Sequence, residues 1–284
     1  MAEAVIRVEK LVHVYPRGNV KALKGIDLDI NKGDVVSIVG QNGSGKTTLV
    51  RHFNGLLRPT EGKVYLMGED STGKSVAEMS RRCGYVFQNP NHQIFCTTVR
   101  EELMVAPKYF GFTQQQADES LKMVSELMGL EHLLDKHPMT LDYTTKKIIT
   151  IASVLIFAPE VLVLDEPTGG LDEVGREMLT KIIRLMHDEG HTVVIISHDM
   201  ELCGRELQPR GGDGPGRNFG RRCAGKGVFE CRYSETCTGR APANHAAGPS
   251  PWPKGNGHGR AFGGGFCKKI RFLSFMSQPP DGRV

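Results

Sequence analysis

Short apolar runs and longer amphipathic segments alternate along most of the chain. The short runs are typical of strands, and the longer segments have the period of helices with one apolar side. Strands are expected at 4–14, 25–30, 34–39, 63–67, 84–87, 161–164 and 192–196, the first of them at a sheet edge. Helices are expected at 46–57, 99–110, 114–128, 144–157 and 173–187.

A glycine-rich loop follows the strand expected at 34–39. Its sequence, GQNGSGKTT, fits the phosphate-loop pattern of a glycine, four residues and then Gly-Lys-Thr. Glycines let backbone N–H groups converge on one anion, Lys46 adds positive charge, and the Thr47 hydroxyl is placed to bind Mg²⁺. The expected cofactors are therefore ATP and Mg²⁺, and the nucleotide-binding residues are Gly40, Gln41, Asn42, Gly43, Ser44, Gly45, Lys46, Thr47 and Thr48.

These patterns predict an α/β fold of the P-loop NTPase class. Strands that alternate with helices indicate a mostly parallel sheet, buried on both faces. We expect antiparallel N-terminal strands beside this sheet and a helical subdomain at about 98–158, all within one domain of residues 1–202. Ligands bind at the carboxyl ends of the strands in such sheets, so residues at those ends are the candidates for chemistry.

Four polar residues besides the phosphate loop stand at such strand ends. Asp165 is placed to hold Mg²⁺, and Glu166 to orient and deprotonate a water that attacks the γ-phosphate. Gln88 is a candidate metal ligand or water-holding residue, and His198 a hydrogen-bond donor to the γ-phosphate. Each also has a plain structural interpretation, as a solvated turn, a loop glutamine or a structural histidine; the adjacent phosphate loop favours catalysis.

Together these motifs resemble those of the ABC transporter ATPase subunits, in the same order and spacing over residues 4–202. The resemblance rests on the phosphate loop, Gln88, the LVLDEPT segment at 162–168, Gly-Leu-Asp at 170–172 and Ser-His-Asp at 197–199. The stretches FQNPNHQIF at 87–95, TVREE at 98–102 and APKYFG at 106–111 resemble the ATPase of energy-coupling factor transporters, the cobalt and vitamin type.

The resemblance implies a head-to-tail dimer that sandwiches ATP between subunits. Tyr15 would stack on adenine, although a surface turn tyrosine is an equal reading without this context. Asp172 would reach across the dimer, and residues 88–110 would meet membrane partner subunits. The expected partners are thus a paralogous ATPase and integral membrane proteins, with no nucleic acid, and the expected location is the cytoplasmic face of the membrane.

The signature motif of that family, Leu-Ser-Gly-Gly-Gln, is replaced here by Leu141, Asp142, Tyr143, Thr144 and Thr145. Asp142 puts a carboxylate where the partner's γ-phosphate is expected. At ~4 Å and an effective dielectric near 20, two such charges repel by about 4 kcal/mol. We therefore expect a heterodimer with one competent and one degenerate site, with Leu141, Asp142 and Thr144 at the interface. A regulatory subunit without turnover remains the alternative.

The composition changes after residue 202. Residues 1–202 carry 22 Lys and Arg against 27 Asp and Glu, whereas 203–284 carry 14 against 5, with five of the seven cysteines. Residues 203–284 have three interpretations: a zinc site, an RNA-binding segment, or a disordered, non-native tail. The zinc site is disfavoured because paired cysteine knuckles are absent, and the disordered tail is favoured. Reading residues 203–222 one base later, with free choice of codons, can encode VAENYNRVVVMAQGGILAEG, a strand-turn-strand pattern. A frameshift near residue 203, and with it an unstable product, is therefore a further hypothesis.

No uninterrupted apolar run is long enough to cross a bilayer, because the nearest, 148–164, is broken by Pro159 and Glu160. The N-terminus lacks the basic start and apolar run of a signal peptide. Any membrane role is therefore expected to depend on partner chains. A soluble ABC ATPase that acts on nucleic acid is disfavoured, since the chain has one phosphate loop and no long heptad run.

Overall fold

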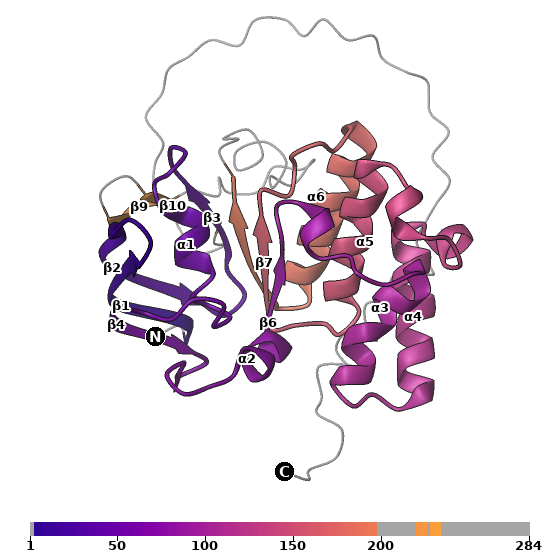
Figure 1. Ribbon diagram of the computed structural model, residues 1–284, viewed down its shortest axis with the longest axis horizontal. Helices are drawn as coiled ribbons and strands as arrows, with labels where there is room; N and C mark the ends of the chain where they lie inside the picture. Colours follow the sequence, from indigo (N-terminus) through magenta and orange to yellow (C-terminus); the bar gives the residue numbers. More distant parts are fainter. Residues whose placement is uncertain (1–2, 198–219, 226–227, 234–284) are drawn as a thin grey trace, which may run out of the picture.

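The computed structural model of the protein describes residues 3–197, 220–225 and 228–233. An antiparallel sheet opens the chain, with strand order β2-β1-β4-β5 (Figure 1). Its strands are β1 (Ala4–Tyr15), β2 (Val20–Asn31), β4 (Glu61–Leu66) and β5 (Glu69–Asp70). The expected antiparallel N-terminal strands are confirmed. The prediction that the first strand lies at an edge is wrong, because β1 pairs with β2 on one side and β4 on the other.

The second sheet has six strands in the order β6-β7-β8-β3-β10-β9. They are β6 (Cys83–Val86), β7 (Val161–Asp165), β8 (Thr192–Ile196), β3 (Val35–Val39), β10 (Val228–Tyr233) and β9 (Gly220–Gly225). Neighbours among β6, β7, β8 and β3 run parallel, whereas β10 is antiparallel to both β3 and β9. The predicted α/β fold with a mostly parallel core is confirmed.

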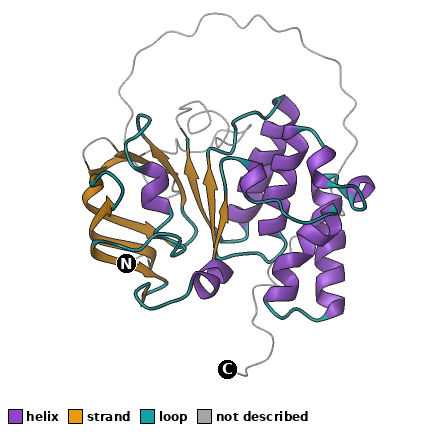
Figure 2. Ribbon diagram, viewed as in Figure 1, coloured by secondary structure: helices purple, strands orange, loops and turns teal. Residues whose placement is uncertain are grey.

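Helices cover one side of the parallel sheet, as Figure 2 shows in purple. They are α3 (Val99–Tyr109), α4 (Gln114–Met128), α5 (Tyr143–Leu155) and α6 (Glu173–Asp188), with the short 3₁₀ turns η1 (Pro90–His92), η2 (Glu131–Leu133) and η3 (Pro138–Thr140) between β6 and α5. Capping boxes start α3 at Thr98 and α4 at Thr113, where the side chain three residues on, Glu101 or Gln116, bonds back to the cap residue's N–H. In the described part of the chain, none of the helices has the length and apolar character that a bilayer crossing needs.

The parallel strands are buried on both faces, as their continuous apolar runs predict. In β7, Leu162 and Leu164 pack into the core shared with α3 to α6. Val161 and Val163 face the other way, into a core shared with the antiparallel sheet and Phe53. Inside these four strands Ser37 and Tyr85 are polar but uncharged, and the charged side chains lie only where the strands end.

Two local expectations need correction. The helix after the phosphate loop, expected to reach residue 57, is α1 (Lys46–Val50) alone. Beyond it, the N–H groups of His52 and Phe53 bond three residues back, to Leu49 and Val50, and Gly55 has a φ of 75° that an α-helix does not accommodate. The stretch between the strands expected at 63–67 and 84–87, for which the sequence predicts no element, contains β5 and the helix α2 (Val76–Arg82).

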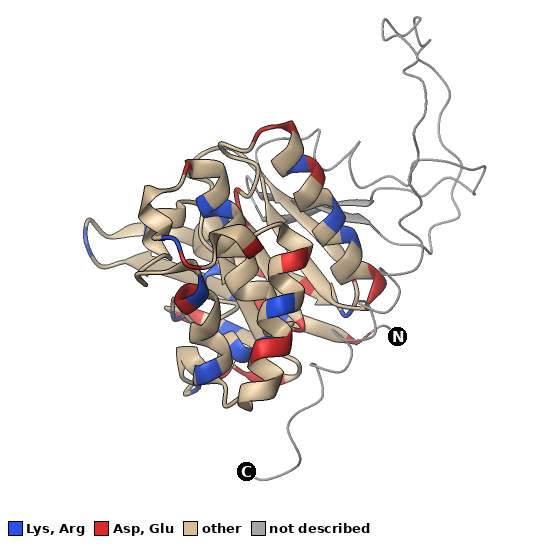
Figure 3. Ribbon diagram, turned by 90° about the vertical axis from the view of Figure 1, so that its right-hand side faces the viewer, with Lys and Arg blue, Asp and Glu red and all other residues tan. Residues whose placement is uncertain are grey.

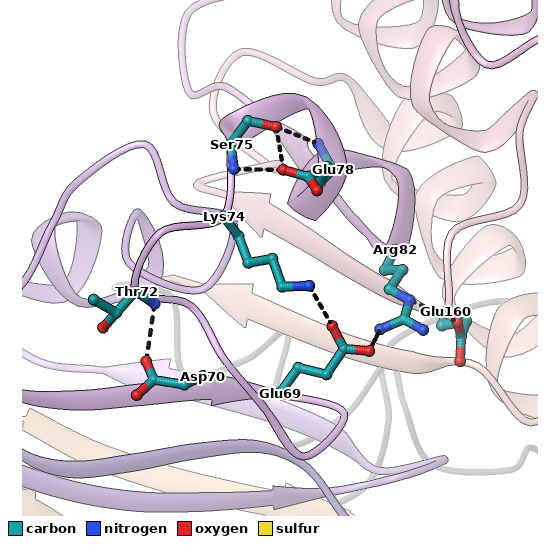
Figure 4. A network of polar contacts seen from close by, with 8 residues as sticks. All are labelled: Glu69, Asp70, Thr72, Lys74, Ser75, Glu78, Arg82 and Glu160. Atoms are coloured by element: carbon teal, nitrogen blue, oxygen red, sulfur yellow. Dashed lines mark hydrogen bonds and ion pairs between the residues drawn. The ribbon is translucent and has the colours of Figure 1, made fainter. Parts of the chain in front are cut away.

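Polar contacts order this second stretch (Figure 4). Ser75 caps α2 in a capping box with Glu78. The Glu69 carboxylate pairs with Lys74 and with Arg82, both at 3.0 Å. Such exposed pairs contribute little each, because water screens them, so the cap and the local turn dominate. The periodicity of apolar residues does not reveal α2, because polar contacts and a cap stabilise this helix.

Two stretches of the tail expected at 203–284 are described, and both are strands. All five residues of β3 pair with β10, from Val35↔Tyr233 to Val39↔Phe229. These two stretches have regular backbone pairing, whereas the disordered, non-native character expected for residues 203–284 as a whole stays a prediction. The other residues of the tail, with the cysteine and histidine positions proposed for zinc outside these strands, lie beyond the described residues.

Gly62 and Gly68 offer a matched test of the antiparallel sheet. Both have positive φ, 83° and 78°. A Cβ at Gly62 would overlap the backbone oxygens of Glu9 and Lys10, whereas one at Gly68 would meet nothing within 4 Å. We expect Gly68→Ala to lower the free energy of unfolding by about 1–2 kcal/mol from backbone strain alone. Gly62→Ala should cost at least ~2 kcal/mol more, measured by urea unfolding; equal losses would contradict this packing.

Candidate nucleotide-binding site

A cavity of about 750 Å³ lies between β2 and the glycine-rich loop after β3. Its walls join residues from four distant parts of the chain. The lining comprises Tyr15, Val20, Lys21, Ala22, Leu23, Lys24, Gly25, Ile26, Asn42, Gly43, Ser44, Gly45, Lys46, Thr47, Thr48, Gln88 and Glu166. The structure thus brings together most of the residues that the sequence singles out.

The loop conformation depends on glycine. Gly43 has a φ of 78°, and Gly45, which precedes α1, has a φ of 93°. A Cβ on Gly45 would also lie 2.9 Å from the backbone oxygen of Ala22, so neither the turn nor the approach to β2 admits a side chain. These two constraints shape the phosphate-sized turn that the sequence predicts.

Lys46 and Ser44 show that the loop suits an anion. The Lys46 ammonium donates to the backbone oxygens of Gly40 at 2.8 Å and Gln41 at 3.0 Å, so it is folded back over the loop. The Ser44 hydroxyl is buried and has no hydrogen-bond partner among the described residues. A buried hydroxyl without a partner is costly, and a phosphate oxygen would accept its hydrogen bond. The residues present therefore fit a bound phosphate group.

Asp165 lies at the carboxyl end of β7 and is 1% exposed. One carboxylate oxygen accepts from the Thr47 hydroxyl at 3.3 Å, and the other from the Tyr85 hydroxyl at 2.6 Å. Burial and the Asp165 charge raise the pKa of Tyr85, so its hydroxyl stays a donor. A fixed carboxylate beside a threonine hydroxyl is an oxygen donor set that suits Mg²⁺.

Glu166 follows directly and lines the cavity at 9% exposure. Its φ of 48° lies in the left-handed region, where a residue other than glycine is strained by about 1–2 kcal/mol. Its N–H donates to Ile196 at 3.0 Å, which ties it to the end of β8. The strained turn thus places Glu166 at the cavity. Strained backbone of this kind is common at functional residues.

Gln88 lies just past the end of β6 and lines the same cavity. Its backbone oxygen accepts from Lys147 at 2.6 Å and from the Tyr143 hydroxyl at 3.4 Å. Lys147 is fully buried, and burial lowers its pKa to about 8 against the opposing charges of Asp165 and Glu166. Gln88 therefore sits in a loop whose backbone is fixed by α5.

Tyr15 forms another wall of the cavity. Its hydroxyl lies 3.0 Å from that of Thr48, and its ring meets His13 edge to face at 4.6 Å. Behind it His13 and His52 are buried, with His52 donating from Nδ1 to the Thr48 oxygen at 2.7 Å. Burial lowers the pKa of His52, which favours its neutral form beside the phosphate loop. Stacking of Tyr15 on adenine stays a prediction.

The residues predicted at a dimer interface all have roles within the chain. Asp142 caps α5 by accepting from the Thr145 N–H at 2.9 Å, and Asp172 caps α6 through the Gly175 N–H at 2.8 Å. Thr144 donates to the Gly170 oxygen at 3.1 Å, and Leu141 packs against the helical core. Their contacts with a second subunit stay predictions. His198 lies outside the described residues.

Comparison with known proteins identifies the chain. The ABC transporter family model matches residues 23–169. The energy-coupling factor transporter ATP-binding protein EcfA of Methanocaldococcus jannaschii is 40% identical over 200 residues, which cover 70% of this chain and 71% of EcfA. The chain belongs to the ABC transporter ATPase family. The match to EcfA2 of Acetivibrio thermocellus, 40% over 208 residues with 72% and 74% covered, agrees that this ABC ATPase is of the energy-coupling factor type.

Solved ABC structures share the fold. CbiO1 of Clostridium perfringens, part of the ABC transporter complex CbiONQ, has a TM-score of 0.63 at 32% identity, covering 70% of this chain and 80% of CbiO1. The dimeric cassette MJ0796 bound to ADP and phosphate has a TM-score of 0.64 at 26% identity, with 69% and 89% covered. A related protein of Caldanaerobacter subterraneus is longer: the chain spans 35% of its length at 37% identity over 198 residues, 70% of this chain.

Sequence reasoning missed two residues of this ABC ATPase site. Tyr85 reads as one apolar position of a buried strand, and nothing in the pattern says that its hydroxyl reaches Asp165. Lys147 reads as a charge on an amphipathic helix. A signal was present in both cases. Tyr85 comes three residues before Gln88, and Lys147 stands four and seven residues before Ile151 and Val154, on the buried face of α5.

Tyr85→Phe should weaken the expected Mg²⁺ site while preserving the fold. It removes one donor to the Asp165 carboxylate, an interaction worth about 1.5–3 kcal/mol, and leaves the ring in place. We expect turnover of ATP to fall by roughly 10-fold and the Mg²⁺ concentration for half-maximal turnover to rise. Steady-state assays across a Mg²⁺ series measure both. Tyr65→Phe, on half-buried β4, is the matched control; equal behaviour of the two variants would contradict the prediction.

Proposed function

We propose that the chain binds and hydrolyses ATP to energise membrane import of a metal ion or vitamin through partner membrane proteins. The observation that carries this proposal is one cavity lined by the glycine loop together with Lys46, Thr47, Gln88 and Glu166. The energy-coupling factor type of the family supports the transport role, since its relatives carry that name. The substrate itself is chosen by another chain.

In the proposed reaction Lys46 and the loop N–H groups hold the phosphates of ATP. Thr47, Asp165 and Gln88 would hold Mg²⁺, which supplies neutralisation of the developing charge. Glu166 orients a water and takes its proton as the water oxygen attacks the γ-phosphorus. The bond to the bridging oxygen breaks, so ADP and inorganic phosphate leave. His198 is proposed as a hydrogen-bond donor to the γ-phosphate.

The proposed contact with membrane subunits uses the segment at 88–110. Phe95, which precedes α3, and Tyr109, the last residue of α3, are 73% and 69% exposed. Exposed aromatic side chains are enriched at protein interfaces and are rare on a free surface. This supports a peripheral location on the cytoplasmic face of a membrane, held by partners that supply the bilayer-crossing segments.

The degenerate signature supports a heterodimer. Contacts with Thr145 lower the pKa of Asp142, the hydroxyl contact first, so Asp142 remains ionised at neutral pH. Its carboxylate already occupies the N-terminus of α5, where an intact signature offers free N–H groups to a phosphate. The proposed competent site therefore pairs this chain's phosphate loop and Glu166 with the signature of a paralogue. A purely regulatory subunit is the alternative, favoured by the same cap.

Nucleic-acid binding gains no support from the described surface. On the face seen in Figure 3, Lys and Arg positions alternate with Asp and Glu along the helices. A nucleic-acid interface usually needs one continuous basic patch. We therefore retain protein partners as the proposal.

Glu166→Gln tests the proposed base. The amide keeps the shape but cannot take a proton, so turnover should fall at least ~10²-fold while ATP binding persists. Trapped ATP, counted by filter binding of the labelled nucleotide after rapid dilution, should rise. Glu177→Gln on the exposed face of α6 is the control and should change neither. Unchanged turnover in Glu166→Gln would remove Glu166 from this role.

Restoring the signature tests the heterodimer. We expect the purified chain alone to hydrolyse ATP slowly and a complex with its paralogue to turn over robustly. Changing Asp142→Ser, Tyr143→Gly, Thr144→Gly and Thr145→Gln should raise turnover of the lone chain by at least ~10-fold, because the carboxylate no longer competes with phosphate. The same change with Glu166→Gln should remain inactive. Robust turnover by the unmodified lone chain would contradict the heterodimer.

A further inference from the structure

Lys147 occupies an unusual place in this site. It lies on α5 and is completely buried. Its ammonium donates to three backbone oxygens, those of Phe87 at 3.2 Å, Gln88 at 2.6 Å and Glu166 at 3.4 Å. An ammonium has three donors, so each N–H finds an acceptor and the cost of burying the charge is offset.

The three oxygens belong to two segments that leave neighbouring strands. Phe87 and Gln88 follow β6, and Glu166 follows β7, which pairs with β6. Both Gln88 and Glu166 line the nucleotide cavity. Lys147 does not line it, and it therefore acts on the cavity through the backbone of these two residues.

We propose that Lys147 is a positioning residue for ATP hydrolysis: its ammonium ties the backbone of Gln88 and of Glu166 to α5 and so fixes the two side chains relative to each other. The proposal rests on the proposed ATPase function and adds a residue to it. The strained turn at Glu166 makes such a tie useful, because a left-handed residue persists only where its surroundings hold it.

Further bonds join the same segment to α5. The Gln93 side chain accepts from the Phe87 N–H at 3.1 Å and donates to the Thr150 oxygen at 2.9 Å. The Tyr143 hydroxyl donates to the Gln88 oxygen at 3.4 Å, one turn before Lys147. Of these links, only Lys147 also reaches Glu166. A shift of α5, which begins at the degenerate signature, would thus move Gln88 and Glu166 together.

The test separates the donors from the bulk of the side chain. Lys147→Met keeps the length and removes every donor, whereas Lys147→Gln keeps an amide N–H₂ near the same oxygens. In the complex with the paralogue we expect Lys147→Met to lower kcat at least ~20-fold, because small misplacements of catalytic groups cost up to ~10²-fold. Its KM for ATP and its Kd for a non-hydrolysable ATP analogue should change less than ~3-fold. Lys147→Gln should stay within ~5-fold of the unmodified kcat.

Lys122→Met, at an exposed position of α4, is the matched control and should leave kcat, KM and Tm unchanged. An unaffected kcat in Lys147→Met would overturn the proposal. So would a joint loss of kcat, analogue binding and Tm, which indicates a purely structural residue, or equal damage by Met and Gln. No turnover in the unmodified complex would overturn the proposed function as well, so the two failures are distinguishable.

Discussion

The burial of four parallel strands on both faces is the constraint on which this site depends. Side chains along β7 and β8 alternate between two apolar cores, so a polar group within either strand would be buried without solvent. The chemistry is therefore confined to the carboxyl ends, where Asp165 and Glu166 leave β7 and the glycine loop leaves β3. Because neighbouring ends lie one strand apart, about 5 Å, segments distant in sequence face one triphosphate-sized cavity.

This constraint also explains how much the sequence could predict. Strand β8 and helix α4 have the predicted bounds, because their apolar periods are unambiguous and their ends carry polar residues or caps. Position in a sheet is different: β1 looks like an edge strand, but its pairing with β4 comes from residues about 50 positions away. The backbone pairing of β10 with β3 also joins segments distant in sequence. An exposed sheet edge can pair with a strand whose own apolar pattern is weak.

Within the site, motifs and strand ends predict which residues carry the chemistry. They do not predict which distant groups a long side chain contacts. The phosphate loop, Gln88 and the Asp165-Glu166 pair follow from motif and strand end. The structure places residues 42–48, Gln88 and Glu166 around one cavity, and Asp165 accepts a hydrogen bond from Thr47 beside it. Tyr85 and Lys147 escape because a hydroxyl or an ammonium at the end of a long side chain acts beyond its own element. Burial of their stems is readable from the pattern, whereas the direction of the polar tip depends on packing.

The N-terminus of α5 shows how one helix end can serve either of two partners. Its free N–H groups can be satisfied by a carboxylate of the same chain or by an anion from outside, and each excludes the other. Here Asp142 satisfies them in cis, with Thr145 supplying both an N–H and a hydroxyl. The same helix holds Gln88 and Glu166 through Lys147, one to two turns further on. A helix capped by its own chain is therefore still tied to the cavity, which is compatible with the proposed heterodimer, in which this subunit keeps its own phosphate loop but offers its neighbour no signature.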